Sequence, residues 1–101
     1  NEVTLNAQTG TAYTIVPTDN GKLVTLANSG AIALTIDTNA NAPIDIGATI
    51  AFQQTLAGLV TMSGAGITFH NRNGLTSGGQ YAVWSITKTA TDTWLVAGDL
   101  V

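Results

Sequence analysis

The chain has 101 residues, of which 45% are hydrophobic and only 9% are Asp, Glu, Lys or Arg, and its formal net charge is −3. A chain of this length builds one hydrophobic core, so we expect a single domain over residues 1–101. Three cations are too few for nucleic-acid phosphates or an anionic membrane surface, and the absence of Cys excludes disulfides, thiolate metal sites and a cysteine nucleophile.

The sequence pattern predicts strands. In six triplets two large apolar residues flank a threonine: Val3-Thr4-Leu5, Tyr13-Thr14-Ile15, Val24-Thr25-Leu26, Leu34-Thr35-Ile36, Val60-Thr61-Met62 and Ile67-Thr68-Phe69. Because successive side chains of a strand point to opposite faces, each triplet predicts an apolar pair in the core and a threonine outside. No long window shows helical apolar spacing without Gly, Pro or β-branched residues interrupting it, so we expect no substantial helix.

Nine strands are predicted in chain order. They are Val3–Ala7, Ala12–Val16, Leu23–Ala27, Ile32–Asp37, Thr49–Gln54, Leu59–Ser63, Ile67–Asn71, Tyr81–Thr89 and Thr93–Ala97. Asn20-Gly21 and Asn73-Gly74 predict tight hairpins between antiparallel strands, because both residue types tolerate positive φ. The short connection Ala90-Thr91-Asp92 predicts a further hairpin between the last two strands.

These elements predict an all-β fold, a single antiparallel β-sandwich or jelly-roll-like domain. A right-handed β-helix is the main rival architecture. The two Asn-Gly turns argue against it because hairpins make antiparallel neighbours, and the triplets are too unevenly spaced for a regular solenoid. Trp94-Leu95-Val96 is apolar on both faces, which is typical of a strand inside a sheet or under a neighbouring subunit.

The scarcity of charge favours assembly. Typical domains have roughly 25% charged residues, and monomers depend on mixed surface charge for solubility. We therefore expect a homo-oligomer, with a neutral polar monomer as the alternative. Since the chain opens at Asn1 rather than Met, we expect it to be trimmed, excised from something longer or given without its start. We expect neither a membrane span nor a signal peptide.

Candidate chemistry is sparse. His70 is the only histidine, and no second His, no Cys and no Glu besides Glu2 accompanies it. The segment 37–41 (DTNAN) imitates the start of a calcium loop, but Ala42 stands where such a loop requires Gly, so we expect a turn. The spacing of the five aspartates does not exclude a glycosidase-like pair, but nothing favours one. We expect no catalytic, cofactor-binding or metal-binding residue.

Loops and aromatic residues offer the remaining sites. Gly64-Ala65-Gly66 and Ser77-Gly78-Gly79 lack the helix start and Lys of a phosphate loop and predict turns. The aromatic residues Phe52, Tyr81, Trp84 and Trp94 lie in apolar runs, which favours core or interface packing over sugar stacking. His70, Asn71, Arg72 and Asn73 gather polar donors at a turn, so this segment is the candidate ligand-facing or partner-facing loop.

The order of elements also resembles a known family. The segments that carry the resemblance are 13–28 (YTIVPTDNGKLVTLAN), 31–36, 46–50 (IGATI), 58–61, 64–68 (GAGIT), 79–82 and 91–100 (TDTWLVAGDL). They look like a small β module of tailed-bacteriophage virion proteins, found at the ends of tail-fibre-like proteins and as stand-alone capsid decoration proteins. The resemblance implies a β-sandwich or jelly-roll-like unit, usually trimeric, with no catalytic role and no cofactor.

Two functions follow as expectations. The first is a capsid decoration (cement) protein that assembles as a trimer on the virion surface, with the major capsid protein as partner. The short chain favours it. The alternative is a tail-fibre or receptor-binding adhesin module that recognises a host surface glycan or protein, which the non-Met start and the aromatic residues favour. Neither involves an enzyme, nucleic acid or a membrane.

Overall fold

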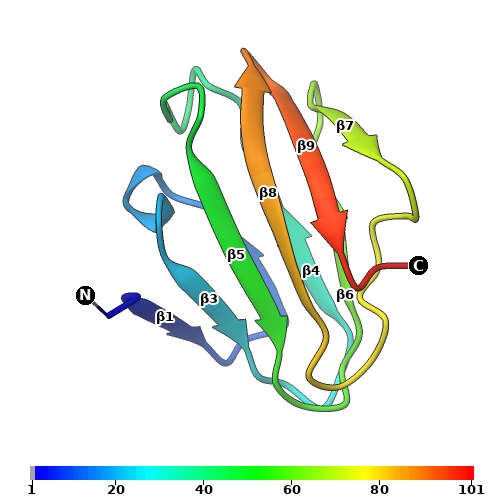
Figure 1. The fold of residues 1–101 in the computed structure, drawn as a ribbon. Helices are drawn as coiled ribbons and strands as arrows, with labels where there is room; N and C mark the ends of the chain where they lie inside the picture. The colour runs from blue at the N-terminus through cyan, green and yellow to red at the C-terminus, as the bar shows by residue number, and fades with distance from the viewer. Residues whose placement is uncertain (1) are drawn as a thin grey trace.

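The computed structural model describes residues 2–101 and contains nine strands and one short 3-10 helix (Figure 1). The predicted domain begins at Asn1, and the expectation about the chain's start also concerns this residue. Asn1 lies outside the described residues. The elements are β1 (Leu5–Gln8), β2 (Ala12–Thr14), η1 (Pro17–Asp19), β3 (Leu23–Leu26), β4 (Ile32–Thr35), β5 (Thr49–Gln54), β6 (Val60–Ser63), β7 (Thr68–Asn71), β8 (Val83–Ala90) and β9 (Thr93–Gly98). All nine predicted strands are confirmed. No helix in the described part is long and apolar enough to cross a membrane.

The strands form two sheets. The large sheet has the order β1-β3-β5-β8-β9-β7, and the small sheet has the order β2-β4-β6. From β1 to β6 the chain alternates between the sheets, so that each successive pair of strands makes one coil and the coils stack in parallel. In Figure 1 the arrows of β3 and β5 point down and that of β4 points up. The result is a β-solenoid-like arrangement.

The all-β prediction is confirmed, but the antiparallel sandwich or jelly-roll is not. Five of the seven strand pairings are parallel, and only β5–β8 and β8–β9 are antiparallel. The hairpin predicted at Asn20-Gly21 is wrong, because η1 and Gly21 lead the chain from the small sheet into the large one, and the Gly21 N–H bonds the Thr49 carbonyl at 2.8 Å. Asn73-Gly74 also follows β7 without forming a hairpin. The hairpin at residues 90–92 is confirmed by the β8–β9 pairing.

The core lies between the sheets and follows side-chain alternation. Its fully buried large members include Val24, Leu26, Phe52, Trp84, Ile86 and Trp94 from the large sheet and Ile32, Leu34, Val60 and Met62 from the small one. The rings of Phe52 and Trp84 stack with centroids 5.7 Å apart. The Val3-Thr4-Leu5 triplet departs from the prediction: Val3 and Leu5 are each 62% exposed.

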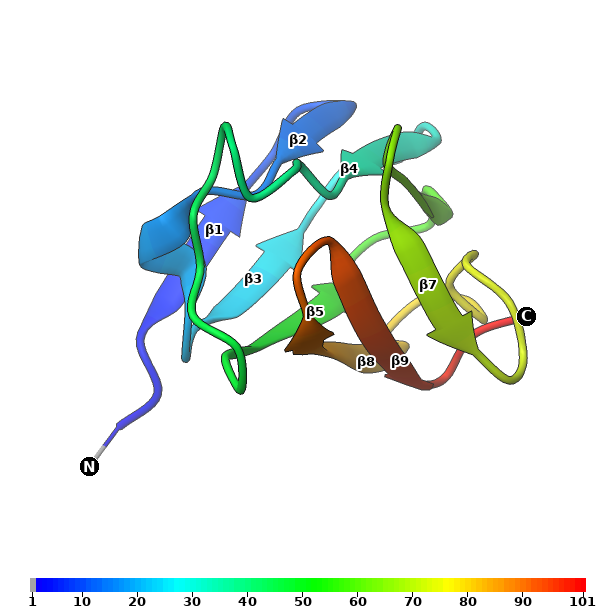
Figure 2. The ribbon, with the colours of Figure 1, turned by 90° about the horizontal axis from the view of Figure 1, so that it is seen from above.

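The two ends of the coil stack differ (Figure 2). At the C-terminal end β8 runs antiparallel beside β5, and residues 75–77 run beside β6, where the Met62 N–H bonds the Leu75 carbonyl at 2.8 Å. At the N-terminal end β1 and β2 each pair on one side only within residues 2–101. Antiparallel segments therefore follow the coils at one end, where β7 is the outermost strand of the large sheet, and β1 and β2 are the outermost strands at the other end.

Candidate functional site

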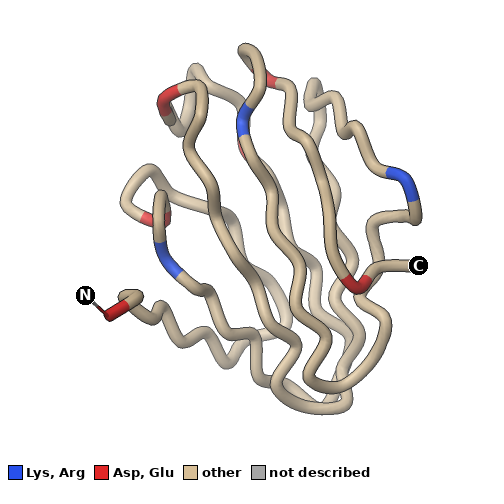
Figure 3. The backbone as a smooth tube through the Cα atoms, in the orientation of Figure 1, with Lys and Arg blue, Asp and Glu red and all other residues tan. Residues whose placement is uncertain are grey.

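The outer face of the six-stranded large sheet comprises the strand side chains that alternate with the core residues. The register aligns them in rows: Leu5, Leu23, Ala51, Ser85 and Ala97 in one, Thr49, Thr87, Leu95 and His70 in the next, and Ala7, Thr25, Gln53 and Val83 on the other side. In the described residues these rows hold no Asp, Glu, Lys or Arg. Figure 3 shows charge mainly in loops and near strand ends, apart from Lys88 in β8.

The outer face mixes apolar and neutral polar side chains, since seven of the thirteen aligned residues are Ala, Val or Leu. Leu5 is 62% exposed, and Val83 and Leu95 are each 49% exposed. The Thr49 and Thr87 hydroxyls, which face each other across β5 and β8, lie 3.0 Å apart and satisfy one another. A sheet face of this kind loses little hydration when it is covered, so it can serve as a contact surface.

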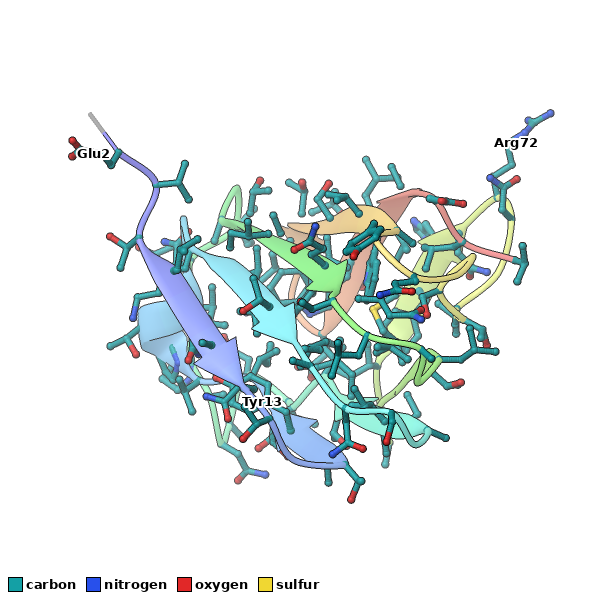
Figure 4. All side chains as sticks on the ribbon, turned by 90° about the horizontal axis from the view of Figure 1, so that it is seen from below. Glu2, Tyr13 and Arg72 are labelled. Carbon is teal, nitrogen blue, oxygen red and sulfur yellow. The ribbon has the colours of Figure 1, made fainter. Side chains whose placement is uncertain are left out.

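The predicted loop His70–Asn73 is divided between two surfaces. All four residues are exposed, but His70 and Asn71 belong to β7 while Arg72 and Asn73 form the turn after it. His70 is in register with Leu95 and so lies at the margin of the outer face. The Arg72 side chain projects away from the body of the molecule (Figure 4). The structure therefore does not bring the four residues together as one site.

A shallow pocket adjoins the second half of this segment. It has a volume of about 150 Å³ and is lined by Arg72, Asn73, Gly74, Val96, Ala97, Gly98 and Leu100. Arg72 and Asn73 bring hydrogen-bond donors to its lining, and Val96, Ala97 and Leu100 bring apolar side chains. This chemistry fits a small polar or anionic group of a ligand and supplies no acid–base pair or nucleophile.

A buried carboxylate closes the N-terminal end of the core. Asp19 in η1 is 0% exposed. Its Oδ2 accepts hydrogen bonds from the Tyr13 hydroxyl at 2.6 Å and the Val16 N–H at 3.1 Å, and its Oδ1 accepts one from Asn6 Nδ2 at 2.8 Å. Burial of the Tyr13 ring, together with its bond to Asp19, raises the pKa of Tyr13 to about 12. Figure 4 shows Tyr13 where β1 and β2 come together.

Lys88 is the second polar group that the sequence analysis missed. It is 3% exposed, and its Nζ donates to Asn39 Oδ1 at 2.6 Å and to the Ile44 carbonyl at 2.7 Å. The same Nζ lies 6.0 Å from the centroid of Trp94. Lys88 thus fixes the connection between β4 and β5 onto the core, a structural role. Strand alternation places it on the face of Trp84 and Ile86, and this signal was available in the sequence.

The calcium-loop mimic is a turn. Asp37 Oδ1 accepts the Thr38 N–H at 2.8 Å and Asn41 Nδ2 at 3.2 Å, so the carboxylate is engaged by its own segment. Among residues 2–101 no group of three or more His, Asp or Glu side chains converges in a way that could hold a metal ion.

Comparison with known proteins gives no assignment: no family model, no curated protein and no solved structure matches the chain. A functional proposal therefore depends on the outer face, on the pocket and on the sequence resemblance.

Proposed function

We propose that this chain is a non-enzymatic structural protein of a tailed-bacteriophage virion, a capsid decoration (cement) protein that assembles as a trimer on the particle surface. The observation that carries the proposal is the outer face, which combines exposed Leu and Val side chains with neutral polar ones and has no Asp, Glu, Lys or Arg in its described strand positions. The virion, the trimer and the major capsid protein as partner come from the resemblance to phage β modules.

An uncharged face suits contact between identical copies. When three copies turn one face toward a three-fold axis, side chains near the axis meet the same side chains of the neighbours. A charge there would meet its like in a partly desolvated interface, which is unfavourable. A face of aliphatic, hydroxyl and amide side chains, with His70 at its margin, avoids this repulsion, and burial of Leu5, Val83 and Leu95 stabilises the contact.

The projected area of the outer face can be compared with the area of a standard protein–protein interface. Six strands about 4.8 Å apart and about five residues long at about 3.3 Å per residue give roughly 480 Å² in projection. A standard interface covers roughly 800 Å² on each partner. Because area alone does not fix affinity, assembly is tested up to about 100 μM, and we expect further stabilisation when the trimer docks on a particle.

Light scattering coupled to gel filtration tests the assembly. In the face variant, Val83→Lys with Leu95→Lys, two half-exposed positions of the outer face gain charge. The control Ile46→Lys charges an apolar side chain that is 64% exposed in the loop before β5. We expect three chains, or a multiple of three, for the wild type and the control, and loss of the three-fold assembly in the face variant. A wild type that stays monomeric at about 100 μM contradicts the proposal.

The pocket beside Arg72 favours the second candidate, a tail-fibre or receptor-binding module that recognises a host surface glycan or protein. Electron microscopy of labelled particles separates the two functions, since regular positions on the head mean decoration and a tail position means adhesin. Binding to host cells by the Arg72→Ala and His70→Ala variants tests the adhesin directly. Unchanged affinity in both variants removes it.

A further inference from the structure

The N-terminal end of the coil stack exposes backbone of β1. β3 bonds one set of β1 groups: the Leu23 N–H bonds the Thr4 carbonyl at 3.1 Å, and the Ala27 N–H bonds the Gln8 carbonyl at 2.9 Å. In a parallel pair, alternate residues of a strand bond to one neighbour. The N–H and C=O groups of the intervening residues, Leu5 and Ala7, therefore point to the open side of the large sheet.

β2 exposes a second edge at the same end. The Ala33 N–H bonds the Thr11 carbonyl at 2.8 Å, and the Ile15 N–H bonds the Thr35 carbonyl at 3.1 Å. By the same alternation the N–H and C=O groups of Ala12 and Thr14 point to the open side of the small sheet. Within residues 2–101 no strand pairs with either edge.

Neither edge carries the features that normally prevent pairing. Natural edge strands are protected by Lys, by other charges, by Pro or by a covering segment. The sequence from Val3 to Val16 contains no Lys, Arg, Asp, Glu or Pro. At the opposite edge of the large sheet β7 also contains no charged residue or proline, although the exposed Arg72 follows it at once, and the free side of β6 is covered by residues 75–77. The N-terminal end is therefore the end at which both sheets present an unguarded edge strand.

The polar side chains of β1 at this end already have hydrogen-bond partners within the chain. Gln8 Nε2 donates to Asn6 Oδ1 at 2.8 Å, and Asn6 Nδ2 donates to the Tyr13 hydroxyl at 2.9 Å and to the buried Asp19. This polar layer covers the apolar core. A partner on the two edges therefore needs to supply backbone pairing, and no apolar core of its own.

We propose that the edges of β1 and β2 pair with the same two edges of a second copy of this chain across a two-fold axis. An axis normal to the sheets and at the end of the stack brings β1 against β1 and β2 against β2, each antiparallel. Leu5 then stands opposite Ala7 of the second copy and exchanges both backbone hydrogen bonds with it, and Ala12 stands opposite Thr14. Both sheets continue without a break from one copy to the other.

The second copy is the occupant that fits this end. It presents two free edges with the same separation, whereas a single extended peptide covers only one of them. The charges are also compatible, because the segment from Val3 to Val16 brings no charged side chain from either copy into the contact. The polar layers around Asn6 and Asp19 meet each other instead of meeting an apolar surface.

This two-fold contact does not depend on the proposed function. The face variant and an edge variant separate the two contacts. In the edge variant, Ala7→Pro with Ala12→Pro, each proline removes an N–H that points to the open side, a position where edge strands tolerate proline. The matched control, Ala7→Val with Ala12→Val, keeps both N–H groups and the β propensity.

The measured mass at high protein concentration gives the result. With both contacts the assembly contains six chains when the two axes cross and more when they do not. The edge variant leaves three chains, the face variant leaves two, and the two variants combined leave one. The valine control keeps the wild-type mass. An edge variant with the wild-type mass overturns the two-fold contact, and so does a face variant that is monomeric at about 1 mM. Loss of the three-fold assembly alone counts only against the proposed function.

Amide hydrogen exchange supplies a readout that needs no proline substitution. In the face variant we expect exchange at Leu5, Ala7, Ala12 and Thr14 to slow by about tenfold or more as the concentration rises through the dimerisation range. Unprotected exchange at these four amides in a concentrated sample overturns the inference. Protection that does not change on dilution also overturns it, because the edges would then be covered within one chain.

Discussion

Replacement of Asp19 by alanine is predicted to weaken the fold strongly, because the carboxylate accepts three hydrogen bonds at the N-terminal end of the core. The donors are the Tyr13 hydroxyl, Asn6 Nδ2 and the Val16 N–H. A buried donor left without an acceptor costs about 1–3 kcal/mol. Tyr13 and Asn6 are partly exposed and can rebind water, so the lower part of that range applies to them. We expect a loss of about 3–4 kcal/mol in the free energy of unfolding.

Urea unfolding followed by the fluorescence of the buried Trp84 and Trp94 measures this loss. For a domain of this size the slope is about 1 kcal/mol per molar urea, so Asp19→Ala should lower the midpoint by about 3 M at fixed protein concentration. The control Asp45→Ala removes an exposed carboxylate and should change the free energy by less than about 0.5 kcal/mol.

A double-mutant cycle assigns the effect to the hydrogen bonds. Tyr13→Phe alone should cost about 1 kcal/mol, and its effect should nearly vanish in the Asp19→Ala background because the acceptor is already gone. Equal midpoints for Asp19→Ala and Asp45→Ala would refute the reasoning. Strictly additive effects of Tyr13→Phe and Asp19→Ala would show that the 2.6 Å contact contributes nothing.

Three further predictions concern Tyr13, Lys88 and Gly98. The pKa of Tyr13 rises from 10.0 to about 12 on folding. The contribution of this group to the free energy of unfolding is therefore complete below pH 10 and is lost as the pH rises through 12. For this partly exposed group the loss should be about 1–2 kcal/mol, measured by urea unfolding at about pH 9 and about pH 11.5, and absent in Tyr13→Phe. Lys88→Met leaves Asn39 Oδ1 and the Ile44 carbonyl without their donor, so it should lower the free energy of unfolding by about 2–4 kcal/mol. The control Lys22→Met should lower it by less than about 0.5 kcal/mol. Equal unfolding midpoints for the two variants would exclude a structural role for Lys88. Gly98→Ala should lower the free energy of unfolding by more than about 2 kcal/mol in the same assay, since φ at Gly98 is +132° and the added Cβ would meet Trp84. In the control Gly10→Ala the added Cβ meets nothing closer than 3.7 Å. Equal stability of the two variants would contradict this prediction.

Strand positions could be predicted because side-chain alternation is a local property. Leu34-Thr35-Ile36 and Val60-Thr61-Met62 carry their burial pattern within three residues, and the structure follows it. Strand partners are not local. Gly21 and Gly74 adopt positive φ, at 80° and 141°, but Asn20 and Asn73 do not, and neither pair makes the predicted hairpin. Positive φ serves a turn that changes sheets as well as a hairpin, so the turn residues did not distinguish parallel coils from antiparallel neighbours.

The outer face could be predicted only in part from the sequence. Alternation in β8 and β9 places Val83 and Leu95 opposite the tryptophans, so this part of the outer face follows from the pattern alone. The predicted strand Ile67–Asn71 already ends where β7 ends and so separates His70 from Arg72. The pairing of β7 with β9, which puts His70 beside Leu95 at the margin of the outer face, does not follow from the pattern. The Asp19 network was also hidden, since its donors lie on β1 and β2 and meet the carboxylate only after the first coil has closed.

β1 reverses the usual pattern of burial, with polar side chains inside and an apolar one outside. This reversal concerns both the outer face and the free edge of the strand. β1 points Asn6 and Gln8 toward the core and Leu5 toward solvent, although burial of a leucine stabilises a fold by about 1.5–3 kcal/mol. Asp19 and Tyr13 explain the polar side chains, because they bond Asn6 inside the end of the stack. Nothing within residues 2–101 covers Leu5, which stays 62% exposed beside an unpaired backbone edge. A partner that covers the outer face and a copy that extends β1 would both bury this leucine, so the exchange of polar for apolar positions in β1 is consistent with assembly rather than with a solitary domain.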